Sequence, residues 1–109
     1  MSEQPQVSLE RYRSEGVRVF AGRERGEEVR RKAELDILDE RTDVSVIEVL
    51  VPLDVFSVNS SFFLGMFGPS VRKLGERGFR AKYRFSGKDI SGTVDEGIRE
   101  ALNRESPLP

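Results

Sequence analysis

The chain has 109 residues, enough for one domain with a single modest core, and its 18 basic and 19 acidic side chains leave a net charge of −1. That balance gives no overall positive field, so we expect neither nucleic acid nor an acidic membrane surface as a partner. Because the chain has no cysteine and no histidine, it lacks thiolate ligands and the usual general base, and we expect a protein that is not an enzyme, with no catalytic residue, metal or cofactor.

Two short strands are predicted at the start of the chain. Residues Gln6–Tyr12 alternate weakly between apolar and polar side chains, and Val17–Phe20 follows a turn signal at 14–16. Neighbouring strands joined by a short turn usually pair with each other, so we expect an N-terminal β-hairpin.

A charged segment that opens at Gly22 follows the hairpin. Within it Val29, Ala33 and Ile37 recur every four residues and Leu38 joins them. This spacing places the four side chains on one stripe and predicts an amphipathic helix.

The next segment predicts a strand that leads into a helix. Val44–Val51 carries apolar side chains on both alternating sets, which is typical of a central strand. We expect the helix to begin at Ser60 and Pro69 to kink or divide it, because proline donates no backbone N–H. Gly75 and Gly78 are predicted to close this helix.

The clearest alternation in the sequence is Phe79–Phe85, where apolar side chains alternate with cations. It predicts a strand with one covered face and one solvated face. Thr93–Glu96 has the spacing of a capping box, and a helix follows with one apolar face. That face consists of Val94, Ile98, Ala101 and Leu102.

The predicted element order is ββαβαβα in one domain across residues 1–109, with tails at 1–5 and 105–109. Strand–helix–strand units should give parallel neighbours through right-handed crossovers. No apolar run approaches the roughly 20 residues of a membrane span. We therefore expect a cytoplasmic protein without a membrane partner.

The acidic residues between the first helix and the central strand suggest no chemistry of their own. We expect them on a charged, solvated surface, with no acid–base pair and no metal site among them. They are Asp36, Asp39, Glu40 and Asp43.

Three short motifs resemble a known family. Gly22-Arg23 precedes a helix, Ser60-Ser61-Phe62 follows a hydrophobic strand, and Met66-Phe67-Gly68 comes soon after. Together with the element order over 17–103, they resemble the STAS-like domains of unknown function, relatives of the sulfate transporter and anti-sigma factor antagonist fold. The resemblance implies a small α/β domain with a mixed four-stranded sheet and helices on one face.

The same resemblance implies a regulatory role. In anti-sigma factor antagonists, a serine at this helix start is phosphorylated by a partner kinase that is also the anti-sigma factor, and the phosphate abolishes binding. By analogy Ser60 is the first candidate and Ser61 the second, with Asn59 where an acidic residue commonly stands. The implied partner is a protein such as a kinase or anti-sigma-like ATPase, and a homodimer is an alternative.

The helix start also has other interpretations. Asn59, Ser60 and Ser61 are ordinary capping residues, and a cap alone contributes about 1 kcal/mol. A small ligand, either a nucleotide or another anion, is a second candidate, because a helix N-terminus attracts negative charge and Arg23 could help to bind it.

The dense apolar cluster that follows the helix start is a candidate contact surface. Four large groups within six residues cannot all face one side of a helix, so some are expected at the surface. The candidates are Phe63, Met66 and Phe67.

Overall fold

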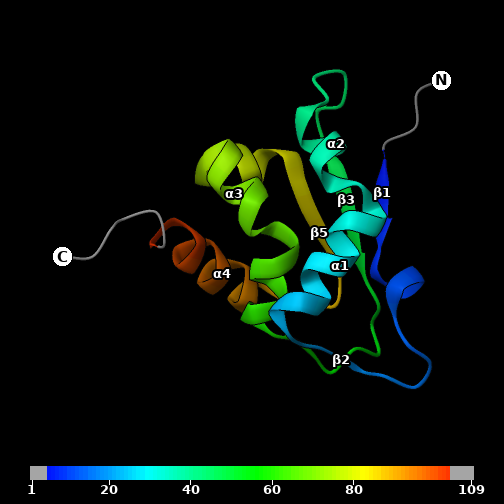
Figure 1. The fold of residues 1–109 in the computed structure, drawn as a ribbon. Coiled ribbons are helices and arrows are strands. Elements are labelled where there is room, and N and C mark those ends of the chain that lie inside the picture. Colours follow the sequence, from blue (N-terminus) through cyan, green and yellow to red (C-terminus); the bar gives the residue numbers. More distant parts are fainter. Residues whose placement is uncertain (1–4, 104–109) are drawn as a thin grey trace.

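Parallel strands and helices build a small α/β domain in the computed structural model, which describes residues 5–103 (Figure 1). The strands are β1 (Gln6–Ser8), β2 (Val19–Phe20), β3 (Ile47–Val51), β4 (Ser57–Val58) and β5 (Tyr83–Gly87). The helices are the 3₁₀ helix η1 (Leu9–Tyr12), α1 (Arg23–Ala33), α2 (Leu35–Glu40), α3 (Ser60–Lys82) and α4 (Ser91–Asn103). Apart from Pro5, the expected tails lie outside the described residues.

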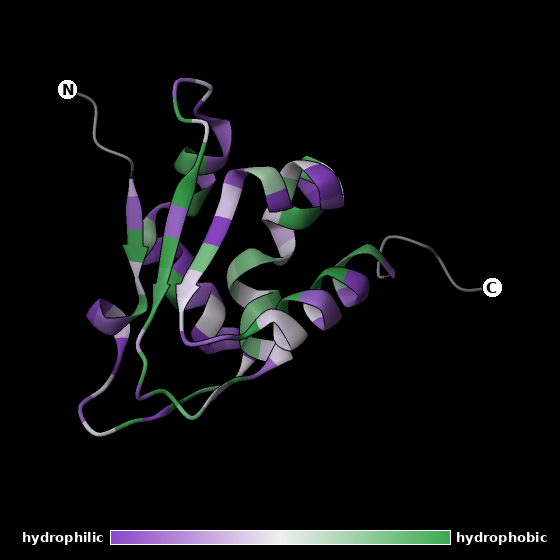
Figure 2. Ribbon diagram, turned by 180° about the vertical axis from the view of Figure 1, so that it is seen from behind, coloured by the Kyte–Doolittle hydropathy of each residue, from purple (hydrophilic) through white to green (hydrophobic). Residues whose placement is uncertain are grey.

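The main sheet has three parallel strands in the order β1-β3-β5. Val7, Val49 and Phe85 stand side by side in register, and this row faces the helices. The helices lie on one side of the sheet, and Figure 2 shows the opposite face, where Glu48 stands between Gln6 and Arg84. That polar row suits the solvated face that the alternation predicted for the last strand.

The core lies between the sheet and α3, whose first half is almost wholly buried. Helix α1 packs closely on α3, because each has a glycine at the crossing. Gly26 lies against the backbone of Phe62, and Gly65 lies against the backbone of Arg23 and Glu27. No helix within residues 5–103 is long and apolar enough to cross a lipid bilayer.

The N-terminal hairpin and the mixed four-stranded sheet were wrong predictions. Strand β1 pairs parallel with β3, while β2 pairs parallel with β4 in a separate two-stranded sheet. After β1 the chain turns as η1, which buries Leu9 beside the core instead of continuing as a strand. Both strands therefore pair with segments far away in the sequence, and turn signals cannot specify such pairings.

The expected long first helix is two helices. Glu34 adopts the left-handed conformation, with φ 57°, and ends α1 immediately before α2 begins at Leu35. Because of this break, α2 presents a different side to the core from the one that the stripe predicted. Leu35 is buried, whereas Ile37 stays exposed.

Helix α3 is interrupted at Gly75 and not at Pro69. Gly75 has φ 76° and ψ 167°, which no helix accommodates, whereas the residues around Pro69 remain helical and buried. After the kink the chain resumes as helix as far as Lys82, so the first half of the predicted last strand is helical. Phe79 stacks on Tyr83 with ring centroids 5.1 Å apart, a spacing of four residues that a helical turn also satisfies.

Candidate functional site

Helix α3 begins at Ser60, as the sequence predicted, and it directly follows β4, a strand that the sequence did not predict. Asn59 has extended backbone angles and its N–H donates to the carbonyl of Phe20 at 2.8 Å, which ties the helix start to β2. Among the described residues, its side chain makes no capping hydrogen bond to the helix. The amide groups of the first turn are therefore not satisfied by Asn59.

The two serines differ in their surroundings. Ser60 is half-buried, whereas Ser61 is exposed and its Oγ accepts a hydrogen bond from the N–H of Gly22 at 3.3 Å. This contact joins the start of α3 to the loop that precedes α1. Ser61 is therefore the more accessible of the two hydroxyl groups, although the sequence ranked Ser60 first.

Arg23 belongs to the same region, because it follows Gly22 at the first position of α1. Its half-buried side chain lies 3.6 Å from the carboxylate of Glu27, an exposed ion pair of the weak i,i+4 type. The structure therefore brings together the predicted residues Asn59, Ser60, Ser61 and Arg23 at two adjacent helix starts.

The three other predicted contact residues lie elsewhere. Phe63, Met66 and Phe67 are each at most 2% exposed and pack in the core, so they form no surface patch. The sequence argument failed because neighbours cover several sides of α3 at once: α1, α4 and the sheet all pack around it.

Exposed apolar side chains occur instead on the two-stranded β2–β4 sheet and the loop before β4. Phe56 is 77% exposed and Leu53 is 79% exposed. The N–H of Phe56 donates to the carbonyl of Arg18 at 2.7 Å, so the loop lies against β2. We call the exposed apolar side chains of this ribbon and of the segments before its strands the ribbon patch, and its members are Val17, Val19, Leu53 and Phe56.

A hollow of about 280 Å³ opens beside Val17 and Val19 and gives the ribbon patch a concave part. Its wall includes Phe20 and Arg25. The Arg25 guanidinium is held by the carbonyl of Tyr12 and by the carboxylate of Glu28, so it stays at the wall of the hollow.

Charged residues border the ribbon patch. Arg13 donates to Asp54 at 3.0 Å, and this hydrogen bond lowers the pKa of that carboxyl. The loop that carries Leu53 and Phe56 is thereby attached to the segment before β2. An apolar centre with a polar rim is the usual composition of a protein-contact surface.

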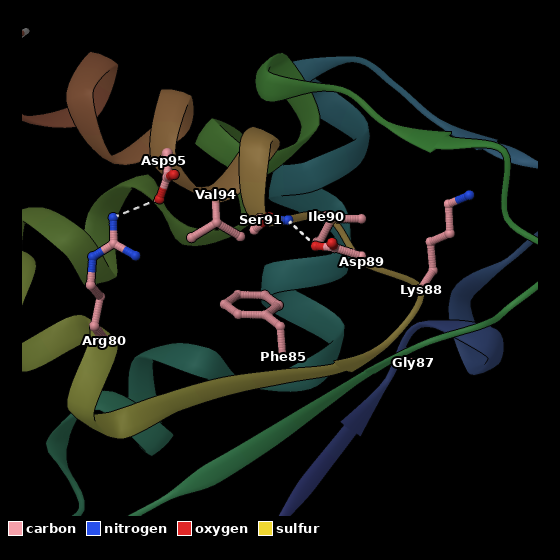
Figure 3. Close-up of a pocket in the computed structure, with 9 residues that line it drawn as sticks. All are labelled: Arg80, Phe85, Gly87, Lys88, Asp89, Ile90, Ser91, Val94 and Asp95. Carbon is pink, nitrogen blue, oxygen red and sulfur yellow. Dashed lines mark hydrogen bonds and ion pairs between the residues drawn. The ribbon is translucent and has the colours of Figure 1, made fainter.

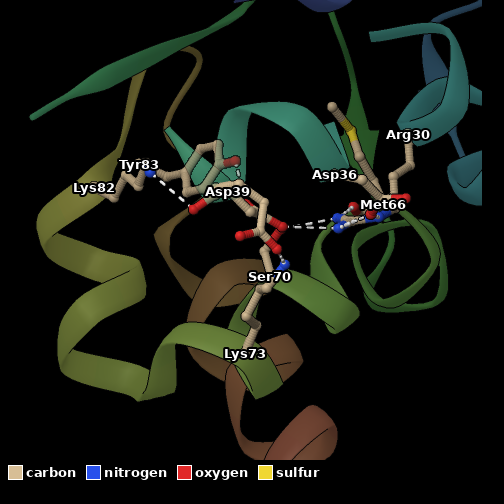
Figure 4. A network of polar contacts seen from close by, with 9 residues as sticks. Arg30, Asp36, Asp39, Met66, Ser70, Lys73, Lys82 and Tyr83 are labelled. Carbon is tan, nitrogen blue, oxygen red and sulfur yellow. Dashed lines mark hydrogen bonds and ion pairs between the residues drawn. The ribbon is translucent and has the colours of Figure 1, made fainter. Parts of the chain in front are cut away.

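A buried polar network fixes the helices relative to one another (Figure 4). Asp39 accepts hydrogen bonds from Ser70, from Arg30 at 2.8 Å and from Tyr83 at 2.6 Å. Arg30 also donates to the carbonyl of Met66 and to Ser70, each at 2.8 Å. The network therefore links α1, α2, α3 and β5.

Two features of this network were not predicted. The sequence placed Asp39 on a wet surface, but its side chain is fully buried, whereas Asp36 is exposed as expected. Burial, and secondly the hydrogen bond to Asp39, raises the pKa of Tyr83 well above its ordinary value. Every buried side-chain polar atom among the described residues has a partner, so this cluster is a structural support.

Comparison of the chain with protein-family models, with curated proteins and with solved structures found no match.

Proposed function

We propose that this protein is a non-enzymatic interaction module that binds a partner protein through the ribbon patch and the adjacent α3 start. The exposure of Phe56 carries the proposal, because a phenylalanine with most of its surface in water is stabilised only when another surface covers it. Leu53, Val17 and Val19 are further exposed apolar side chains of the same ribbon patch. Aromatic anchors of this kind dominate the energy of protein interfaces.

Kinship with STAS-like domains is part of the proposal. Its support is a serine pair at a helix start, directly after a short strand, in a small α/β domain. The expected sheet arrangement is not part of that support, because the strands pair differently.

A phosphate on Ser61 or Ser60 would regulate the contact. It would add about two negative charges beside the ribbon patch and would replace the hydrogen bond between Ser61 and Gly22. The positive end of α3 and the cation of Arg23 would stabilise the phosphate within the domain, while an acidic partner surface would be repelled. The enzyme that adds it would be a kinase-like partner.

Affinity capture from native extract with four matched baits tests this function. The wild type and Ile37→Ser should retain the same partner, because Ile37 is an exposed apolar residue on α2 outside the ribbon patch. Phe56→Ser should lose that partner, and Ser61→Asp should lose it if the phosphate gates the contact. Equal capture by wild type and Phe56→Ser would refute the ribbon patch as the contact surface.

One observation favours a second candidate function, the binding of a small anion. The starts of α1 and α3 are joined by the Gly22–Ser61 hydrogen bond, so two positive helix ends and Arg23 lie together. A thermal-shift series with phosphate and nucleotides tests this idea, because an anion that binds the folded state raises the melting temperature by mass action. An unchanged melting temperature across the series would reject it.

A further inference from the structure

A second candidate site lies between β5 and the N-terminal half of α4, away from the ribbon patch residues. A cavity of about 350 Å³ opens there, with β5 on one side and α4 on the other (Figure 3). This volume is at the lower end of the range for ligand pockets. It is large enough for one or two side chains.

The floor of this cavity is apolar. Phe85 projects from β5 toward α4, and Ile90 and Val94 face it from the other side. Val7 and Val49, which share the row of Phe85 across the sheet, are at most 4% exposed, whereas Phe85 is only partly buried. The aromatic ring therefore has apolar surface that nothing in residues 5–103 covers.

The edge of β5 carries backbone groups that the described sheet does not pair. Strand β5 is the last in the order β1-β3-β5, so its outer side has no neighbouring strand. The N–H of Lys88 donates to Val51 in β3 at 3.0 Å. Because these directions alternate along a strand, the backbone groups of Phe85 and Gly87 face away from β3, toward the open edge. Such an edge is a template for another strand.

The charged side chains around the cavity differ in whether they already have hydrogen-bond or ion-pair partners. Arg80 bonds both Glu76 and Asp95, and Asp89 accepts the backbone N–H of Ser91 at 2.9 Å. Lys88 makes no side-chain hydrogen bond or ion pair with the described residues and is the cation at the rim best placed to meet a carboxylate. Lys88 is therefore the group at this end of the cavity that can pair with a ligand carboxylate, because the charges of Arg80 and Asp95 are paired and Asp89 already accepts from Ser91.

We propose that this groove binds an extended, acidic peptide segment of a partner protein. The segment adds to the edge of β5 and places an aliphatic side chain against Phe85, Ile90 and Val94, with a carboxylate near Lys88. Addition of a strand explains the open backbone edge and the apolar cavity together, because main-chain bonds provide affinity and the side-chain pocket provides selectivity. This proposal does not depend on the ribbon patch.

The test uses the whole chain and a capped probe peptide, acetyl-Thr-Glu-Thr-Ile-Thr-Glu-Thr-amide, followed by two-dimensional NMR. In this peptide the isoleucine and both glutamates lie on the same face of an extended strand. Binding should shift the amide signals of Phe85, Gly87 and Val94 and slow the hydrogen exchange of the Phe85 amide. Replacement of the isoleucine by alanine should weaken binding by at least about tenfold, because the pocket then stays partly empty.

Two further comparisons separate strand addition from simple burial of an apolar group. N-methylation of the isoleucine and N-methylation of the adjacent threonine should differ in effect: one should weaken binding and the other should not. The reason is that only one of two consecutive N–H groups faces β5. Lys88→Glu should weaken binding of the acidic probe and strengthen binding of a probe with lysines in place of glutamates. Arg99→Glu, on α4 outside the cavity lining, should change the binding of neither probe. The proposal is overturned if the probe leaves the Phe85 and Gly87 signals unshifted, or if both N-methylated peptides bind equally well.

Discussion

The buried network around Asp39 and the ribbon patch use side chains in opposite ways. Around Asp39, charged and polar groups that prefer water are buried and fully paired. In the ribbon patch, apolar groups that prefer burial are exposed, as Phe56 and Leu53 show. The first region fixes the relative positions of the helices, and the second remains available for contact. In the proposed function, stability and interaction therefore depend on different residues, and substitutions can separate them.

The largest effect is expected from removal of the central acid of the network. Asp39→Ala leaves the buried guanidinium of Arg30 with only the exposed Asp36 as its acidic partner, and Ser70 and Tyr83 lose their acceptor. Breaking a buried charge pair in this way costs about 3–5 kcal/mol. The matched control is Asp36→Ala, which should cost about 1 kcal/mol or less, because that side chain is 84% exposed. Urea denaturation of both variants measures the two losses. Similar losses for the two variants would contradict a central role for Asp39.

A smaller loss is expected at the crossing of α1 and α3. A methyl group at Gly65 would overlap the carbonyl of Arg23 and lie 2.9 Å from the backbone nitrogen of Glu27. Because backbone cannot move aside as a side chain does, Gly65→Ala should separate the helices and cost about 1–3 kcal/mol. Gly92→Ala in α4 is the matched control, since nothing lies within 4 Å of its added methyl, and it should stabilise by about 0.5 kcal/mol. Thermal unfolding distinguishes the opposite signs.

The sequence predicted those parts of the fold that depend on local chemistry. The helix beginning at Ser60 followed from capping residues in the loop after the central strand, and the central strand followed from a run of apolar residues. Pairing partners were not predictable, because β1 and β2 are three and two residues long and carry no signal for distant strands. The alternation in Phe79–Phe85 is compatible both with a strand and with a helical turn. In the structure the chain bends at Gly75 and then continues as helix to Lys82, so the first half of this segment is helical.

The candidate site was predictable only in part. The positions of the serine pair and of Arg23 at helix starts were predicted, because their neighbours in sequence define them, and their role in a site stays a prediction. The ribbon patch was missed because Phe56 resembles a core residue until the loop before β4 is seen to lie on the outside. Asp39 was missed for the opposite reason, since its partners Ser70 and Tyr83 are more than thirty residues away.

The pH dependence of stability gives a finer test of the network. Tyr83 holds its proton more tightly in the folded state than its ordinary value of 10.0. Between that value and the higher pKa of the folded state, the unfolded chain binds fewer protons, so stability should fall as pH rises above about 10, by ~1.4 kcal/mol per pH unit. Stability curves measured by urea denaturation across pH 9–11.5 check this. In Tyr83→Phe this contribution to the pH dependence of stability should disappear. Near neutral pH the variant should lose about 1 kcal/mol of stability, because it lacks the hydrogen bond to Asp39. An unchanged slope in that variant would assign the alkaline loss to other groups.

The smallest effect on stability should come from the ribbon patch, and this smallness distinguishes its role from that of the core. Phe56→Ala removes a ring that is mostly in water, so the free energy of unfolding should change by no more than about 0.5 kcal/mol. Phe62→Ala, which removes an equally large ring from the core beside Phe20, should cost about 3–5 kcal/mol. Urea denaturation of both variants makes the comparison. A loss above 2 kcal/mol for Phe56→Ala would mean that the ring supports the fold. A near-zero loss means that folding does not require the ring in its exposed position, and this is the property expected of a residue used for contact.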